Sequence, residues 1–116
     1  MLDGVEITQA IREELIAAEE CIEQMQPLGS SLAKAERAYR EAKHKRIAYE
    51  RSRNNTPVSI IQDVVKGYAD IAELVEARDM AQVLYDANRE AELLHKKRAD
   101  ILRDIYVREY GMDYGA

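Results

Sequence analysis

Two pairs with the spacing Glu-x-x-His, Glu41–His44 and Glu92–His95, are the residues of this 116-residue chain whose pattern could hold metal ions. Di-iron helical bundles use two such pairs, together with two further inward carboxylates, to hold their metals. The predicted helix face of His44, however, also carries arginines, which indicates a solvated face. If the chain folds as an antiparallel hairpin, the two pairs would lie roughly 20 Å apart along the helices. We therefore expect no metal site.

The other residue types that could carry chemistry form no catalytic pattern. Cys21 is the one cysteine of the chain, so it forms no internal disulfide, and we interpret it as a small buried thiol. Gly29 and Gly67 are isolated, and the sequence has neither a phosphate-binding loop nor a Gly-x-Ser-x-Gly elbow. We therefore predict no catalytic residue and no cofactor, and expect that the protein is not an enzyme.

A basic stretch over residues 34–53, interleaved with Tyr39 and Tyr49, could follow a phosphate backbone. Its basic residues are Lys34, Arg37, Arg40, Lys43, Lys45, Arg46, Arg51 and Arg53. Residues 54–95 carry eight acidic and three basic residues, so the basic stretch can find its partners within the same chain. We favour this pairing, because the net charge of −5 also argues against nucleic acid. A nucleic-acid-associated factor that uses the basic face of residues 34–53 is the alternative.

Three polar residues, Arg46, Asn88 and Arg98, fall on predicted helix seams. A single buried Asn or Arg in a seam commonly fixes register or oligomeric state at a cost in stability. Such a residue can equally mark a partner surface, and the sequence leaves the two roles open. Together with Arg37 and Arg40 of the basic stretch, they are the candidate partner or register residues.

The elements that must position these residues are all helical. The apolar periodicity predicts a single all-α domain, residues 1–116, with helices over about 5–25, 31–53, 57–66 and 68–110. Pro27 and Gly29 predict a break or sharp kink between the first two helices. Thr56 and Pro57 predict the start of the short helix. Gly67 is expected to end that helix in the left-handed conformation.

Each helix has a predicted apolar seam. On the longest helix the stripe is Leu74, Ala77, Ala81, Leu84, Asn88, Ala91, Leu94, Arg98, Ile101 and Ile105, with Leu84 buried at its middle. On the first helix it is Ile7, Ile11, Leu15, Ala18, Ile22 and Met25. On the second it is Leu32, Ala35, Tyr39, Ala42, Arg46 and Tyr49.

Alternating charge blocks predict how the helices pair. Residues 1–26 are acidic, 27–53 basic and 54–95 acidic. A chain that folds back at residues 54–67 places opposite charges together, which predicts an antiparallel, coiled-coil-like hairpin with a kinked N-terminal arm and a short helix at the turn. The predicted neighbours are Tyr49 with Ile71, Tyr39 with Ala81, Leu32 with Asn88, Gln26 with His95, Ile22 with Ala99 and Ile16 with Ile105.

Several short segments are similar to those of a known group of proteins. They are Ala38-Tyr39-Arg40-Glu41-Ala42-Lys43, Thr56-Pro57, Lys66-Gly67 and Ala77-Arg78-Asp79-Met80-Ala81. With the order of the helices, they resemble small uncharacterised helical-hairpin proteins of phages and prophages. The resemblance implies a bacterial cytoplasmic setting and supplies no functional residues. It also suggests a further alternative, an acidic phage-type inhibitor whose carboxylates Glu73, Glu76, Asp79 and Asp86 mimic phosphates.

Partners and location are predicted from the apolar residues. No apolar run approaches the roughly 20 residues of a membrane span, and no basic segment followed by an apolar one indicates secretion, so we expect no membrane partner and a cytoplasmic protein. Apolar residues outside the narrow seams predict a homodimer, or another protein partner, that covers them. Alternatively, the first helix folds back at Pro27 to make a monomeric three-helix bundle. The function that we expect is a helical interaction or structural protein.

Overall fold

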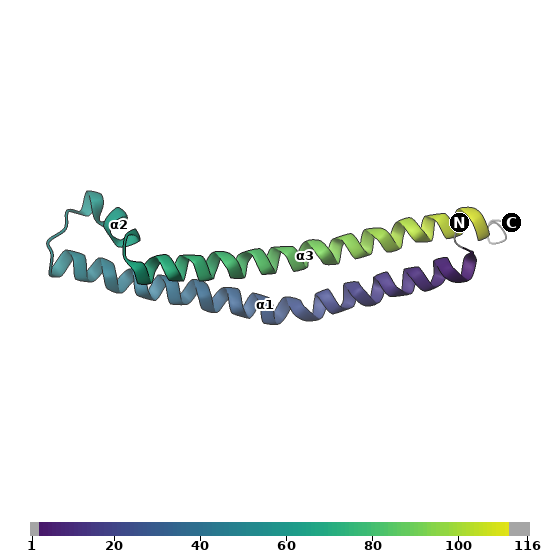
Figure 1. Ribbon diagram of the computed structural model, residues 1–116, viewed down its shortest axis with the longest axis horizontal. Helices are drawn as coiled ribbons and strands as arrows, with labels where there is room; N and C mark the ends of the chain where they lie inside the picture. The colour runs from purple at the N-terminus through teal and green to yellow at the C-terminus, as the bar shows by residue number, and fades with distance from the viewer. Residues whose placement is uncertain (1–2, 112–116) are drawn as a thin grey trace. The chain divides into compact units, whose positions relative to one another are not determined.

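The computed structural model describes residues 3–111, which form helix α1 (Gly4–Ser52), helix α2 (Val58–Lys66) and helix α3 (Ala69–Tyr110) (Figure 1). No strand occurs among these residues. The chain divides into two compact units, each of which contains part of α1 and part of α3. The terminal unit comprises Met1–Gln26 and Asp86–Ala116, and the turn unit comprises Pro27–Tyr85. In both units α1 packs antiparallel to α3, which confirms the predicted all-α helical hairpin.

The first turn of α1 is closed by a capping box that the sequence prediction missed. The backbone N–H of Glu6 donates to Oδ1 of Asp3 at 2.8 Å, and the backbone N–H of Asp3 donates to the Glu6 carboxylate at 3.4 Å. This reciprocal pattern satisfies donors that the first helical turn would otherwise leave unpaired. Thr8 lies inside the helix, where its hydroxyl donates to the carbonyl of Gly4.

Helix α1 is continuous through Pro27, so of the predicted break or sharp kink between the first two helices, the break is wrong. Cys21 and Met25 before the proline, and Leu28 after it, are all half-buried at the same alternating spacing of three and four residues. This unbroken repeat keeps one face of the helix inward, and the resulting packing offsets the hydrogen bond that a proline removes. Because α1 does not fold back, the three-helix bundle alternative is also wrong.

Gly29 is helical and lies beside a tyrosine ring. A Cβ atom at Gly29 would lie 3.5 Å from Cε2 of Tyr85, which is an ordinary van der Waals distance. An alanine would therefore also fit at this position of the turn unit.

The connection between α1 and α2 differs from the sequence prediction in three respects. The left-handed residue is Asn55, at φ 51°, and Gly67 has φ −78°. Asn tolerates the left-handed conformation better than most residues. Helix α2 starts at Val58, and Pro57 occupies the position before it. The Thr56 hydroxyl makes no cap, because it donates to the side chain of Glu50.

The core of the turn unit forms where α2 lies beside the last turns of α1 and the first turns of α3 (Figure 1). Ile61 and Val65 of α2 and Ile71 of α3 are buried together. The residues packed against them are Tyr39, Ala42, Ile47, Tyr68 and Val75. Burial of these three aliphatic side chains stabilises the unit by roughly 1.5–3 kcal/mol each, before the entropy of ordering them is subtracted.

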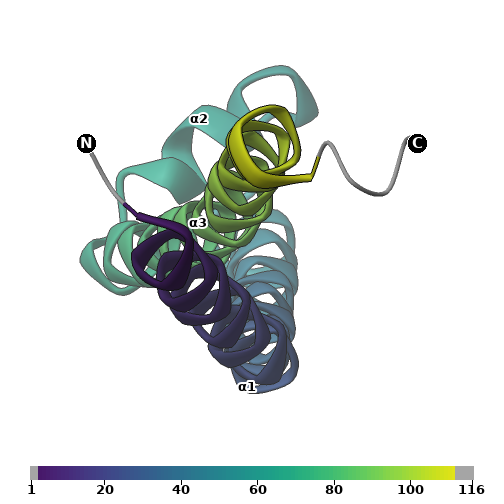
Figure 2. The same cartoon turned by 90° about the vertical axis from the view of Figure 1, so that its right-hand side faces the viewer.

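In the terminal unit the start of α1 and the end of α3 lie side by side (Figures 1 and 2). Ile7 and Ala18 of α1 and Ala99 of α3 are its buried apolar residues. Tyr106 and Tyr110 flank Gly4, where an added Cβ would lie 3.7–3.8 Å from their rings. Small residues at these positions allow the two helices to approach closely.

The inward face of α3 matches the predicted stripe only in part: Leu74, Ala81, Asn88, Ala91 and Ile105 are half-buried, and the other five predicted residues are exposed. The buried or half-buried positions that repeat at steps of three and four are Ile71, Leu74, Arg78, Ala81, Tyr85, Asn88, Glu92, His95, Ala99, Leu102 and Tyr106. This is a 3.5-residue repeat, as in a left-handed coiled coil. Leu84, predicted to be buried, is 53% exposed, and Leu94 and Ile101 also face outward.

On α1 the prediction was better after Pro27 than before it. The second predicted seam is correct from Leu32 to Arg46, where all five of its residues are half-buried, but Tyr49 is exposed and Glu50 is buried in its place. On the first seam Leu15 and Ile22 are exposed, and the inward positions beside them are Glu14 and Cys21.

The antiparallel direction is confirmed, but the predicted register is wrong. His95 contacts Glu14 rather than the region of Gln26, a difference of about three helical turns. Asn88 contacts Cys21 and Met25 rather than Leu32. In the turn unit, the last turns of α1 pack against α2 as well as against the start of α3.

Candidate functional site

A buried carboxylate, Glu50, ties the end of α1 to the turn that follows it. Glu50 is 3% exposed, and its carboxylate accepts hydrogen bonds from the Thr56 hydroxyl at 2.6 Å, the Asn54 amide at 3.1 Å and the Tyr68 hydroxyl. Its backbone carbonyl also accepts from the N–H of Thr56 at 3.0 Å. These donors favour the ionised form, so the hydrogen bond from Thr56 first, then those from Tyr68 and Asn54, lower the pKa of Glu50. The same carboxylate raises the pKa of the Tyr68 hydroxyl.

The lowered pKa of Glu50 predicts acid sensitivity of the turn unit. A folded-state pKa below the unfolded value means that Glu50 stabilises the fold above its ordinary pKa of 4.5, and that this stabilisation is lost as the pH falls below that value. We expect urea unfolding midpoints at pH 7 and pH 3 to differ more for the wild-type chain than for Glu50→Gln. An equal pH dependence in both proteins would contradict this role.

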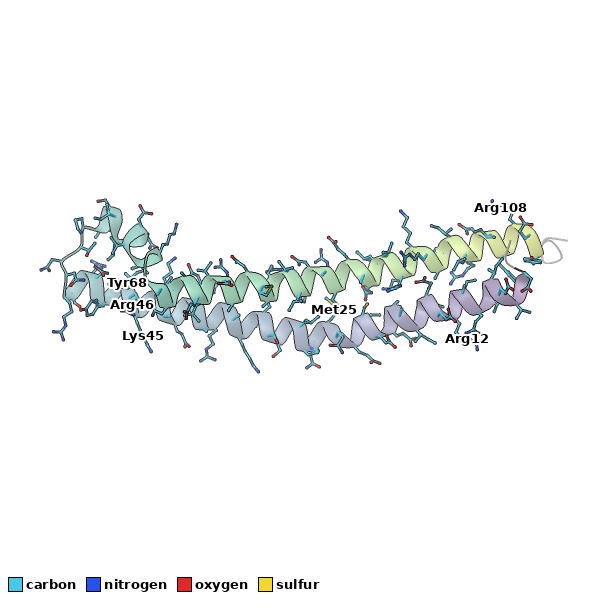
Figure 3. The ribbon with its side chains drawn as sticks, viewed as in Figure 1. Arg12, Met25, Lys45, Arg46, Tyr68 and Arg108 are labelled. Carbon is cyan, nitrogen blue, oxygen red and sulfur yellow. The ribbon has the colours of Figure 1, made fainter. Side chains whose placement is uncertain are left out.

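Arg46 bridges α1, α3 and the turn beside this cluster. Its Nε and Nη2 atoms donate to Oδ2 of Asp70 at 3.2 and 3.1 Å, and its guanidinium lies 4.3 Å from the centre of the Tyr68 ring (Figure 3). The pair is only partly exposed, so it is screened less than a surface ion pair. The contact places the predicted seam residue Arg46 where it can help to set the register of the turn unit.

Arg78 occupies an equivalent seam position that the sequence prediction missed. Its guanidinium lies 4.6 Å from the centre of the Tyr39 ring, and its Nε is 3.7 Å from Glu36 of α1. A hydrogen bond from Arg78 to Asp79 also holds the side chain and raises the pKa of Arg78. The signal that could have identified it is the strict repeat counted from Ile71, which places Arg78 two steps along the seam.

Asn88 makes a polar contact between the two helices of the terminal unit. Its Nδ2 atom donates to the backbone carbonyl of Cys21 at 2.8 Å and lies 3.1 Å from Sδ of Met25. A carbonyl inside a helix already accepts one hydrogen bond, so this additional donor is specific to one alignment of the helices. The structure therefore brings the predicted residue Asn88 into the seam.

The second polar contact of the terminal unit joins Glu14 to His95. Oε2 of Glu14 lies 2.6 Å from Nδ1 of His95, and Nη1 of Arg98 is 4.0 Å from the other carboxylate oxygen. Arg98, which was predicted to lie in the seam, is 53% exposed in its side chain and reaches the seam only from its edge. Glu92, one turn before, has a side chain that is 16% exposed and pairs with Lys96.

The two Glu-x-x-His pairs are not brought together. His44 is exposed in the turn unit, as predicted, whereas His95 is half-buried in the terminal unit. Among residues 3–111 no group of three or more His, Cys, Asp or Glu side chains is placed to hold a metal ion. The carboxylate–imidazole contact of Glu14 and His95 can align the two helices.

The basic stretch is exposed but partly neutralised. Arg37 donates to Glu41 at 2.9 Å and Arg40 donates to Glu36 at 3.1 Å, in each case across one turn of α1. Both arginine side chains are more than 70% exposed. The structure therefore leaves them accessible to a partner, with a carboxylate already beside each one.

Large aliphatic side chains also lie outside the seams of both units. On α3 of the terminal unit they are Leu93, Leu94, Ile101 and Val107, and on α2 of the turn unit they are Val58, Ile60 and Val64. Their exposed fractions run from 38% to 68%. Grouped exposure of this kind is uncommon on monomeric proteins and typical of contact surfaces.

Comparison with known proteins gave no relative: no family model, curated protein or solved structure matches the chain. Among the helices of residues 3–111, none combines the length and apolar character needed to cross a membrane.

Proposed function

We propose that this chain is a non-enzymatic helical interaction protein, which acts by binding another protein or a second copy of itself. The observation that carries the proposal is the surplus of aliphatic surface. The seam between α1 and α3 is already complete in the terminal unit, and Leu93, Leu94, Ile101 and Val107 lie outside it. A partner helix that covers these residues removes apolar area from water at about 25 cal/mol per Å².

A surface variant tests the proposal without disturbing the seam. The chain with Leu93, Leu94, Ile101 and Val107 all changed to Ser should keep its far-UV circular dichroism but lose association. The matched control changes four exposed polar residues of the same helix segment, Glu90, Lys97, Asp104 and Glu109, to Ser and should associate like the wild-type chain. Association is measured as mass by light scattering and as retention of protein partners on the tagged chain. A wild-type chain that is monomeric and retains no protein would overturn the proposal.

Nucleic-acid association is the second candidate, because the side chains of Arg37 and Arg40 are largely exposed. Their carboxylate partners on the same helix weaken the field that a phosphate backbone would meet. Binding of single- and double-stranded DNA over a salt series is the test. A steep loss of affinity with salt, abolished by Arg37→Glu with Arg40→Glu, would support it, and absence of binding at low salt would remove it.

The setting that we propose is the bacterial cytoplasm, in a phage- or prophage-derived protein. It rests on the resemblance of residues 32–110 to small helical-hairpin proteins of phages, and on that alone.

A further inference from the structure

On one side of the terminal unit, the side chains of α1 differ from those of α3 in size and in charge. On each helix, consider the residues that immediately precede alternate seam residues. Because the two helices are antiparallel, these residues of α1 and of α3 lie on the same side of the helix pair. In the turn unit this geometry is visible, since Ala38 and Lys45 of α1 line one depression with Asp70 of α3. In the terminal unit the corresponding positions are Ala10 and Ala17 of α1 and Ala91 and Arg98 of α3. We call this side the alanine flank.

The α1 half of the alanine flank is small and acidic. Ala10 and Ala17 are half-buried beside the seam, and Glu13 and Glu20 are exposed at its outer edge. The side chain of alanine is a single methyl group, so a larger side chain of a partner can pack over these positions. The outer edge of this half carries carboxylates, with no basic residue among these positions.

The α3 half of the alanine flank carries two exposed aliphatic side chains and one basic residue, Arg98, which also approaches Glu14 of the same chain. Leu94 is 47% exposed and Ile101 is 50% exposed, and Arg98 lies between them. The seam residues of α3 point toward α1, whereas these aliphatic side chains point away from it and remain exposed on the flank. The two halves of one flank are thus opposite in both size and charge.

The matching residues lie at matching levels along the pair. The contacts of Glu14 with His95 and of Asn88 with Cys21 fix these levels. Counted from them, Ala17 falls within one helical turn of Leu94, and Ala10 within one turn of Ile101.

We infer that the occupant of the alanine flank is the same flank of a second copy of this chain, related by a two-fold axis parallel to the helices. That axis lays α3 of each copy over α1 of the other at the same level. Leu94 and Ile101 then pack over Ala17 and Ala10 of the second copy, and Arg98 faces the side that carries Glu13 and Glu20. An axis perpendicular to the helices would instead lay acidic α1 over acidic α1. The inference rests on the proposed function and names its partner.

Adjacent leucines provide a matched test of the flank. Leu93 and Leu94 are exposed to similar extents, 55% and 47%, but they point to opposite sides of the seam. The wild-type chain should show about twice the 13.3 kDa mass of one chain by light scattering. Leu94→Asp should raise the dimer dissociation constant at least about tenfold, which corresponds to about 1.4 kcal/mol, whereas Leu93→Asp should leave it unchanged. Circular dichroism verifies that both variants remain helical.

A size exchange tests the pairing itself. Ala17→Leu and Leu94→Ala should each weaken the dimer, and the chain that carries both changes should recover it, because leucine and alanine have exchanged places across the axis. Failure of the double variant to recover, or a larger loss with Leu93→Asp than with Leu94→Asp, would overturn the alanine flank while the proposed function stands. A wild-type chain of single-chain mass at high micromolar concentration would also overturn it, and retention of another protein would then decide the proposed function separately.

Discussion

Ile71→Ala is expected to destabilise the protein by about 2–5 kcal/mol, as observed for large-to-small changes in well-packed cores. Ile71 is 1% exposed and packs with Ile61 and Val65 where α1, α2 and α3 meet, so truncation leaves a cavity that the helices cannot close easily. The free energy of unfolding from urea titration, followed by circular dichroism, measures the loss.

Leu84→Ala is the matched control for this loss. Leu84 lies on the same helix but is 53% exposed, so its truncation should cost about 0.5 kcal/mol or less. Similar losses at Ile71 and Leu84 would mean that α3 presents a different face to α1 than the structure shows.

Ala99→Asp should be about as costly in the terminal unit, about 3–5 kcal/mol, the range found when a buried charge is left without a partner. Ala99 is 1% exposed in the seam, and a carboxylate there would be removed from water. Ala87→Asp, at an exposed position of the same helix, introduces the same side chain and should cost less than about 1 kcal/mol, mainly through helix propensity. A thermal or urea unfolding comparison of the two variants decides between them. A stable Ala99→Asp chain would contradict the register of the terminal unit.

The sequence predicted the fold class well, because charge and periodicity act over many residues. Opposite charge blocks required an antiparallel hairpin, and Arg46 with Asp70 is one cross-helix pair of the predicted sign. The second seam, from Leu32 to Arg46, was predictable because its apolar residues have no competing stripe.

Only part of the inward face of α3 could be predicted from hydrophobicity, because apolar residues lie on more than one face of this helix. Leu84, Leu94 and Ile101 of the predicted stripe face outward, whereas Asn88 of the same stripe faces inward. The inward stripe contains Asn88 and His95, whose burial is favourable only because α1 offers the Cys21 carbonyl and Glu14 at the same levels. Complementary polar pairs of this kind cannot be identified from the sequence until the register of the two helices is known.

The break predicted at Pro27 was wrong for a related reason. A proline inside a helix costs about 3 kcal/mol, so a local rule predicts a break. The seam repeat on both sides of Pro27 keeps its phase, and long-range packing therefore decides the outcome. The strict 3.5-residue spacing from Ile7 through Leu32 was the available signal.

The contact between Glu14 and His95 fixes the register of the terminal unit, which decides which residues of α1 and α3 lie at the same level. Spin labels at residues 13 and 97, in a Cys21→Ala background diluted with unlabelled chain, report the distance within one terminal unit. The structure predicts that this distance is clearly shorter than that between labels at residues 26 and 97, because residues 13 and 26 are roughly 20 Å apart along α1. A shorter distance for the pair 26 and 97 would contradict the register and, with it, the match in level of Ala17 with Leu94 and of Ala10 with Ile101.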